Sequence, residues 1–134
     1  MQKKSITVVC ASLLDEDNNL LICKRPKNKI FEGLWEFPGG KVEINESPEQ
    51  CLIRELNEEL GINVNKRCLA PFTFSTYSYK DFDLLILLYI CRVWDGHPYS
   101  KESQKISWVS LNQVRDFKMP EANKSLVAML IDYL

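Results

Sequence analysis

The chain has 134 residues, 46% of them hydrophobic, and a formal net charge of -1 at pH 7. These values predict one globular domain over 1–134. The chain has no Lys- or Arg-rich block, so it lacks the charge pattern of proteins that bind a nucleic-acid polymer. No apolar run reaches the roughly 18 residues of a membrane span and no signal peptide is recognisable, so we expect a cytoplasmic protein without a membrane partner.

The N-terminal part predicts strands and turns. Apolar, β-rich residues predict a strand over 6–14, a polar turn over 15–19 and a returning strand over 20–24 that pairs with the first as a hairpin. A polar loop is expected over 26–32. The segment 35–40 is extended but interrupted by proline and glycines.

A helix is predicted from Pro48, because Ser47 is a favourable N-cap and Gln50 completes a capping-box pattern. Gly61 is placed to end this helix. An apolar stripe at helical spacing should pack on a sheet. Its members are Leu52, Ile53, Leu56 and Leu60.

Three acidic residues of this helix, Glu55, Glu58 and Glu59, have the spacing i, i+3, i+4 and so share one face. Like charges so placed repel by roughly 0.2–0.5 kcal/mol per i,i+4 pair. Acidic residues on one face are typical of a solvated surface. They also concentrate the hard oxygen ligands that Mg²⁺ or Mn²⁺ prefers.

The C-terminal half predicts longer strands over 68–79 and 82–94 and a short strand over 106–109. Ser110 is expected to cap a brief helix that begins at Leu111.

A terminal amphipathic helix is predicted over 122–134. Its inward residues should be Leu126, Met129, Leu130 and Tyr133. The mixture of strands and helices predicts an α/β fold, an α/β/α sandwich on a mixed sheet.

Five scattered cysteines form no Cys-x-x-Cys motif, and most fall in apolar stretches. We interpret them as reduced core residues, because free cysteine packs as a small hydrophobic side chain. They are Cys10, Cys23, Cys51, Cys68 and Cys91.

Residues 40–62 read Gly-x5-Glu-x7-Arg-Glu-Leu-x-Glu-Glu-x-Gly-Ile, which resembles the signature of the Nudix hydrolases and fills each of its nine constrained positions. The segments 34–43, 94–102 and 119–124 are similar to the MutT-type branch, the 8-oxo-dGTP diphosphatases. The resemblance implies an Mg²⁺-dependent enzyme, with Mn²⁺ as a substitute. We expect the protein to be a monomer. It would cleave a nucleoside triphosphate, above all 8-oxo-dGTP, to the monophosphate and pyrophosphate, and so keep oxidised nucleotides out of DNA replication.

The resemblance also implies roles in metal binding and catalysis. Metal ligands would be the carbonyl of Gly39 and the carboxylates of Glu55, Glu58, Glu59 and Glu102. Glu55 is either a ligand or the general base, and Glu102 binds metal or acts as base unless it is simply a solvated loop residue.

Two further residues of the signature would position the ligands. Arg54 would hold a glutamate of the signature in place, although an ordinary i,i+4 pair with Glu58 is the plainer interpretation. Glu46 would support the loop.

Base recognition is implied for three residues by the same resemblance. Asn123 would hydrogen-bond the purine edge, Arg25 would reach the sugar or base, and Phe37 would shape the base pocket. The plainer alternatives are a helix cap for Asn123, a surface charge for Arg25 and a core residue for Phe37.

Two positions depart from the pattern of the branch. Asn45 stands where glycine is frequent, and Asn is the next best residue for a positive φ. The bacterial type member has an arginine where this chain reads Asp81-Phe82-Asp83, which weakens the expectation of tight selection for 8-oxoguanine.

The alternative substrates are therefore another (d)NTP such as dCTP or a modified pyrimidine nucleotide and, more distantly, dinucleoside polyphosphates or ADP-ribose. A catalytically silent nucleotide-binding module is the alternative from another class. The presence of all three helix glutamates argues against it.

Overall fold

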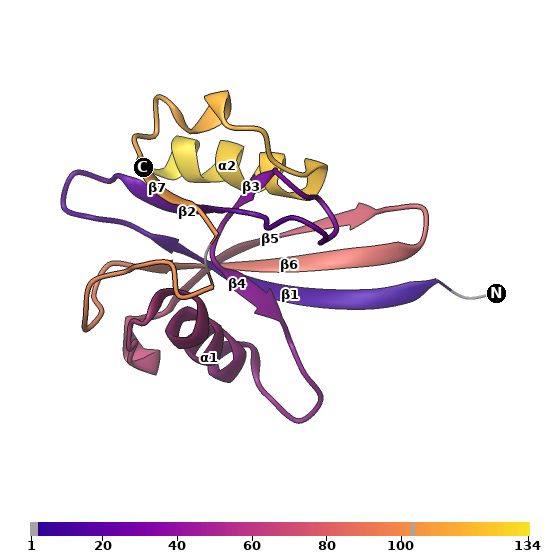
Figure 1. The fold of residues 1–134 in the computed structure, drawn as a ribbon, viewed down its shortest axis with the longest axis horizontal. Coiled ribbons are helices and arrows are strands. Elements are labelled where there is room, and N and C mark those ends of the chain that lie inside the picture. Colours follow the sequence, from indigo (N-terminus) through magenta and orange to yellow (C-terminus); the bar gives the residue numbers. More distant parts are fainter. Residues whose placement is uncertain (1–2, 103) are drawn as a thin grey trace.

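The computed structural model describes residues 3–102 and 104–134, and its strands are enclosed between two helices (Figure 1). Helix α1 (Pro48–Leu60) covers one side of the strands and helix α2 (Glu121–Tyr133) covers the other. Two clusters of buried apolar side chains fill the two interfaces, one under each helix. This arrangement confirms the predicted α/β/α sandwich.

The larger sheet has the strand order β4-β1-β6-β5. Its strands are β1 (Lys4–Leu13), β4 (Gly39–Lys41), β5 (Ala70–Ser78) and β6 (Phe82–Cys91). Strands β1 and β6 are parallel, whereas β4 and β5 join the edges in the antiparallel sense, so the sheet is mixed as predicted. The position of β4 beside β1 brings the start of the 40–62 signature next to the central strands.

The smaller sheet has the order β3-β2-β7 and is antiparallel throughout. Its strands are β2 (Leu20–Lys24), β3 (Trp35–Glu36) and β7 (Ile106–Val109). The prediction that β2 pairs with β1 as a hairpin is wrong, because a single bridge from Leu14 to Leu20 joins them. The turn brings the adjoining ends of β1 and β2 together, but β2 then pairs with the distant strand β7 instead of with β1.

Helix α1 begins and ends where the sequence predicts. The hydroxyl of Ser47 accepts from the backbone N–H of Gln50 at 3.1 Å, and the Gln50 side chain accepts from the Ser47 N–H at 2.8 Å. Gly61 takes φ 70°, and its N–H donates to the Asn57 carbonyl, which closes the last turn. Of the predicted apolar stripe, all but the half-buried Ile53 are fully buried.

Helix α2 packs as predicted along most of its length but not at its end. Leu126 and Leu130 are fully buried and Met129 is half-buried. Tyr133, predicted to point inward, is 67% exposed and contacts the ring of Phe72 at 5.0 Å between centroids. Helix α2 packs over β5, the edge strand of its sheet, and Tyr133 lies at the outer side of this contact, whereas Leu130 in the same turn is buried.

The prediction of a brief helix that begins at Leu111 and is capped by Ser110 is wrong in both its start and its cap. One 3-10 turn, η2 (Val114–Asp116), forms instead without a side-chain cap. The carbonyl of Ser110, rather than its hydroxyl, accepts from the N–H groups of Gln113 and Val114. Another 3-10 turn, η1 (Lys66–Cys68), was not predicted.

All five cysteines are free and all but the half-buried Cys68 are buried, as predicted. Within the described residues, neither helix is long and apolar enough to cross a membrane.

Candidate active site

The acidic face of α1 lies against strand β4. A Cβ atom placed on Gly40 would lie 2.3 Å from the carboxyl carbon of Glu55, far inside van der Waals contact. Only glycine therefore lets this carboxylate approach the strand so closely. The contact joins α1 to the segment whose Gly39 carbonyl is expected to bind metal.

Arg54 holds three of the acidic side chains that surround it. Its Nε and Nη2 atoms donate to the two carboxylate oxygens of Glu46 at 3.0 and 2.8 Å, a bidentate pair. Its Nη1 atom donates to Glu55 at 2.9 Å and to Glu58 at 3.2 Å. The plain i,i+4 pair with Glu58 is thus one part of a larger network.

Glu46 fixes the loop before α1. Besides pairing with Arg54, its carboxylate accepts from the backbone N–H of Glu43 at 2.9 Å. The bonds from Arg54 and then that backbone bond lower the pKa of Glu46 to about 2, so it stays charged at neutral pH. Asn45 in this loop takes φ 68°, the left-handed conformation that the sequence leads us to expect there.

Glu59 is the most unusual acidic side chain of the group, because only 8% of it is exposed. Burial, then the nearby carboxylate of Glu55, and then the charges of Glu36 and Glu102 raise its pKa well above the usual range. The amide of Gln104 donates to it at 3.3 Å. Among residues 3–102 and 104–134, no Lys or Arg forms an ion pair with Glu59.

The loop that carries Glu102 is tied to the end of α1. The N–H groups of Tyr99 and Lys101 donate to the carbonyls of Leu60 and Glu59 at 3.1 and 2.9 Å. These bonds bring Glu102 close enough to raise the pKa of Glu59, although its own side chain is exposed. The structure therefore places Glu102 near the helix glutamates.

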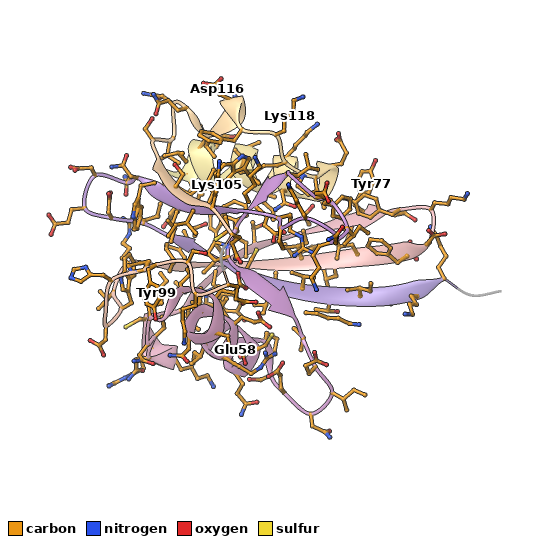
Figure 2. The ribbon with its side chains drawn as sticks, in the orientation of Figure 1. Glu58, Tyr77, Tyr99, Lys105, Asp116 and Lys118 are labelled. Atoms are coloured by element: carbon orange, nitrogen blue, oxygen red, sulfur yellow. The ribbon has the colours of Figure 1, made fainter. Side chains whose placement is uncertain are left out.

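The donor set fits a divalent cation in its chemistry. Carboxylate oxygens with a neighbouring backbone carbonyl are the ligands that Mg²⁺ accepts, and a cation would stabilise the ionised form of Glu59, which burial and the neighbouring acids disfavour. In the described part of the chain, however, no three acidic, Cys or His side chains stand close enough together to hold one ion. Arg54 accounts for the spacing, because it draws Glu55 and the 54% exposed Glu58 toward its own guanidinium. Figure 2 shows where Glu58 lies on α1.

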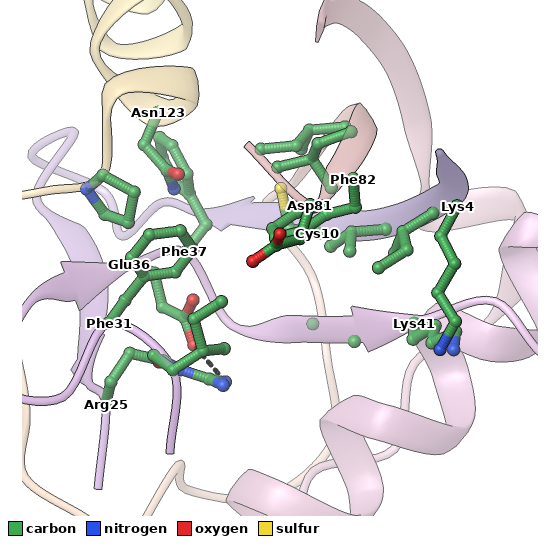
Figure 3. A pocket seen from close by; sticks show the side chains of 18 residues that line it. Lys4, Cys10, Arg25, Phe31, Glu36, Phe37, Lys41, Asp81, Phe82 and Asn123 are labelled. Carbon is green, nitrogen blue, oxygen red and sulfur yellow. Dashed lines mark hydrogen bonds and ion pairs between the residues drawn. The ribbon is translucent and has the colours of Figure 1, made fainter. Parts of the chain in front are cut away.

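A cavity of about 440 Å³ adjoins these acidic residues across β4 (Figure 3). Its walls include Gly39 and Gly40, so the cavity and the Glu55 carboxylate meet at the same strand. All three residues expected to recognise the base also line the cavity. They are Arg25, Phe37 and Asn123.

Two of the three base-recognition candidates, Arg25 and Phe37, contact other residues of the protein as well as the cavity. Arg25 donates to the Glu36 carboxylate at 3.2 Å and to the Ile30 carbonyl at 3.2 Å, so it is not a free surface charge. Phe37 is buried in the core under α2 and also lines the cavity, so the core interpretation and the pocket interpretation both hold.

Asn123 lies in the first turn of α2 with 6% of its surface exposed. The N-cap of α2 is Pro120, so the alternative role of Asn123 as a helix cap is wrong. Figure 3 shows its side-chain amide directed into the cavity, and we find no hydrogen-bond partner for that amide among the described residues. An amide so placed is free to donate to a ligand and accept from it.

Several cavity residues were not predicted. Glu36 pairs with Arg25 and adds to the charge around Glu59, and its position in the apolar run 34–37 was the available signal. Phe31 takes φ 62°, which is uncommon for a bulky residue and has no signal in the sequence. Asp81, in the β5–β6 connection, and Phe82, at the start of β6, also line the cavity.

Residues 9–129 match the family described as "NUDIX domain". The chain is 32% identical over 127 residues to an 8-oxo-dGTP diphosphatase of Escherichia coli K12, covering 95% of this chain and 97% of that protein. It is 52% identical over 126 residues to a CTP pyrophosphohydrolase of the same organism, covering 92% and 90%.

Solved structures agree with these sequence similarities. A structure from a study of MutT from Aliivibrio salmonicida and Vibrio cholerae superimposes with a TM-score of 0.82 at 35% identity, covering 98% of this chain and all of that one. The Escherichia coli ORF135 protein gives the same TM-score at 29% identity, covering 97% and 91%.

Proposed function

Because the chain belongs to the Nudix hydrolase family, we propose that it cleaves a nucleoside triphosphate to the monophosphate and pyrophosphate, with Mg²⁺ bound at the acidic face of α1. Nudix hydrolases are in general dependent on a divalent metal. The observation that carries the proposal is the buried Glu59, which pairs with no Lys or Arg of the described residues and lies among other carboxylates, next to a cavity that can receive a nucleotide.

The metal would be held by the Gly39 carbonyl and by the carboxylates of Glu55, Glu58, Glu59 and Glu102. When bound, a divalent cation neutralises phosphate oxygens and lowers the pKa of coordinated water; Mn²⁺ would substitute for Mg²⁺. A glutamate of this set, Glu55 or Glu102, would accept the proton of the attacking water. Their proximity to Glu59 supports this assignment.

Arg54 would act by positioning these carboxylates rather than by touching the nucleotide. Its bidentate pair with Glu46 anchors the guanidinium to the loop, which leaves Nη1 for Glu55 and Glu58. A fixed guanidinium limits the rotamers that the two glutamates adopt. Both would then turn to the metal from a defined starting position.

The nucleoside would occupy the cavity, whose volume is within the range of small-molecule sites. Phe37 would pack against the base, Asn123 would hydrogen-bond its edge, and Arg25 would lie near the sugar or base. The triphosphate would then run along Gly39 and Gly40 toward the acidic face of α1. The order of these groups around the cavity supports this orientation.

We propose 8-oxo-dGTP as the substrate, and thus removal of oxidised nucleotides from the cytoplasmic pool by a monomer, because several relatives at 32–37% identity carry that activity in their names. A second candidate is CTP or dCTP. It is favoured by the 52% identical relative and by the absence of an arginine at Asp81-Phe82-Asp83.

A nucleotide panel with Mg²⁺ tests the proposal by measuring both products. Release of monophosphate and pyrophosphate is expected, fastest with 8-oxo-dGTP. Faster cleavage of dCTP or CTP would support the proposed reaction but identify the second candidate as the substrate. Release of inorganic phosphate alone, or no turnover of any nucleoside triphosphate, would contradict the proposed reaction.

A further inference from the structure

The cavity contains a carboxylate that the proposed function has not used, that of Asp81. This residue lies in the connection between β5 and β6 and lines the cavity beside Phe82. Figure 3 shows its carboxylate directed into the open space toward the side that carries Phe37 and Asn123. The carboxylate is thus on the nucleoside side of the cavity.

Asp81 differs from the acid two positions along the chain. Asp83 is engaged outside the cavity, where its carboxylate accepts from Lys3 and from the Ser78 hydroxyl. No hydrogen bond or ion pair to Asp81 is found within the described residues, and Arg25, a cation on the cavity wall, is paired with Glu36. The Asp81 carboxylate therefore has free acceptor capacity toward a ligand.

An ionised carboxylate only accepts hydrogen bonds, so its partner in a ligand must be a donor. In a cavity for a polyanion it repels phosphate and any carbonyl oxygen. The exocyclic donors of a nucleobase are its amino groups, and an acidic side chain accepting from the cytosine amino group is an established pairing in base recognition. Aromatic neighbours such as Phe31 and Phe82 suit the flat faces of a base.

We propose that Asp81 is a specificity-determining residue that accepts a hydrogen bond from an exocyclic amino group of the nucleobase. The inference rests on the proposed function. Both candidate substrates satisfy it, since cytosine carries an amino group at N4 and 8-oxoguanine carries one at N2. Uracil and thymine present a carbonyl oxygen in place of the cytosine amino group, and the Asp81 carboxylate would disfavour them.

Comparison of dCTP with dUTP isolates this contact, because the two bases differ where cytosine has its amino group. The wild type should prefer dCTP in kcat/KM. Asp81→Asn supplies an amide that can donate to the uracil carbonyl, so the dCTP-to-dUTP ratio should fall about tenfold or more. Asp83→Asn is the matched control and should leave the ratio within about twofold of wild type.

An unchanged ratio in Asp81→Asn, or a wild type without preference for dCTP, would overturn the inference. Calorimetric binding of dCMP and dUMP gives a readout that does not depend on hydrolysis. Preference for dCMP that is lost in Asp81→Asn supports the contact even if no triphosphate is cleaved, an outcome that would contradict the proposed function alone. Equal binding of the two monophosphates would contradict the role of Asp81.

Discussion

At the scale of single residues, the site depends on which of its mutually repelling glutamates are paired with Arg54 and which are not. Three glutamates on one helix face repel one another, yet Arg54 contacts two of them and also the loop residue Glu46. Glu59 receives no such ion pair from the described residues and has the raised pKa. The ionised form of this poorly solvated carboxyl group is therefore disfavoured unless a cation binds there.

Replacement of Arg54 by lysine tests its positioning role. A lysine ammonium cannot make the bidentate pair with Glu46 while also reaching Glu55, so the carboxylates should lose their fixed arrangement. We expect kcat to fall about 10- to 100-fold and the Mg²⁺ concentration for half-maximal rate to rise. Steady-state kinetics across a Mg²⁺ titration would measure both.

Arg67→Lys is the control, since Arg67 lies on η1 and belongs to neither the cavity nor the acidic network. It should behave as wild type. Full activity of Arg54→Lys with an unchanged Mg²⁺ dependence would show that the network does not position the ligands.

At the scale of elements, the sequence predicts best what local chemistry decides. Both ends of α1 follow from residues next to them, Ser47 and Gly61, and the structure agrees. One of the two partners of β2 is β7, more than eighty residues away, and no local pattern indicates that pairing. Tyr133 fits the helical period of α2, but the edge position of β5 exposes it.

The contact between β4 and α1 gives a test at the same scale. In Gly40→Ala the new methyl group would overlap the Glu55 carboxylate and force the strand and helix apart or turn the side chain away. Because the Glu55 carboxylate ends a flexible side chain and can turn away, we expect activity to be lost while the free energy of unfolding falls by only about 1 kcal/mol. Thermal and denaturant unfolding would measure the stability change.

A double-mutant cycle identifies the cause of that loss. If overlap with Glu55 is responsible, Gly40→Ala should destabilise the Glu55→Ala protein much less than the wild type. Equal destabilisation in both backgrounds would place the cause elsewhere on β4.

At the scale of the whole molecule, the fold gathers the site from segments far apart in the chain. The 40–62 signature predicts the helix glutamates, because helical spacing alone puts them on one face. Glu36 and Asp81 were missed as site residues, since only the packing of β3 and the β5–β6 connection around the cavity brings them there. Sequence reasoning therefore found the proposed reaction centre more completely than the walls of the nucleoside pocket.

Cation binding should stabilise the whole fold, because the acidic cluster around Glu59 exists only in the native state. Mg²⁺ at 100 times its dissociation constant would add about 2.7 kcal/mol to the free energy of unfolding and raise the melting temperature by several degrees. Thermal unfolding with Mg²⁺ and with EDTA at matched ionic strength would measure the shift. The same melting temperature in both would contradict a cation site in the folded protein.

The central claim is that the glutamates of α1 bind the metal that permits phosphate cleavage, and turnover by Glu58→Gln tests it most directly. The side chain is 54% exposed and its pair with Arg54 contributes only about 0.3–0.5 kcal/mol, so the melting temperature without metal should hardly change. With Mg²⁺ and the best nucleotide of the panel, we predict that pyrophosphate release falls by two or more orders of magnitude. Near-normal release by a folded Glu58→Gln protein would contradict the account.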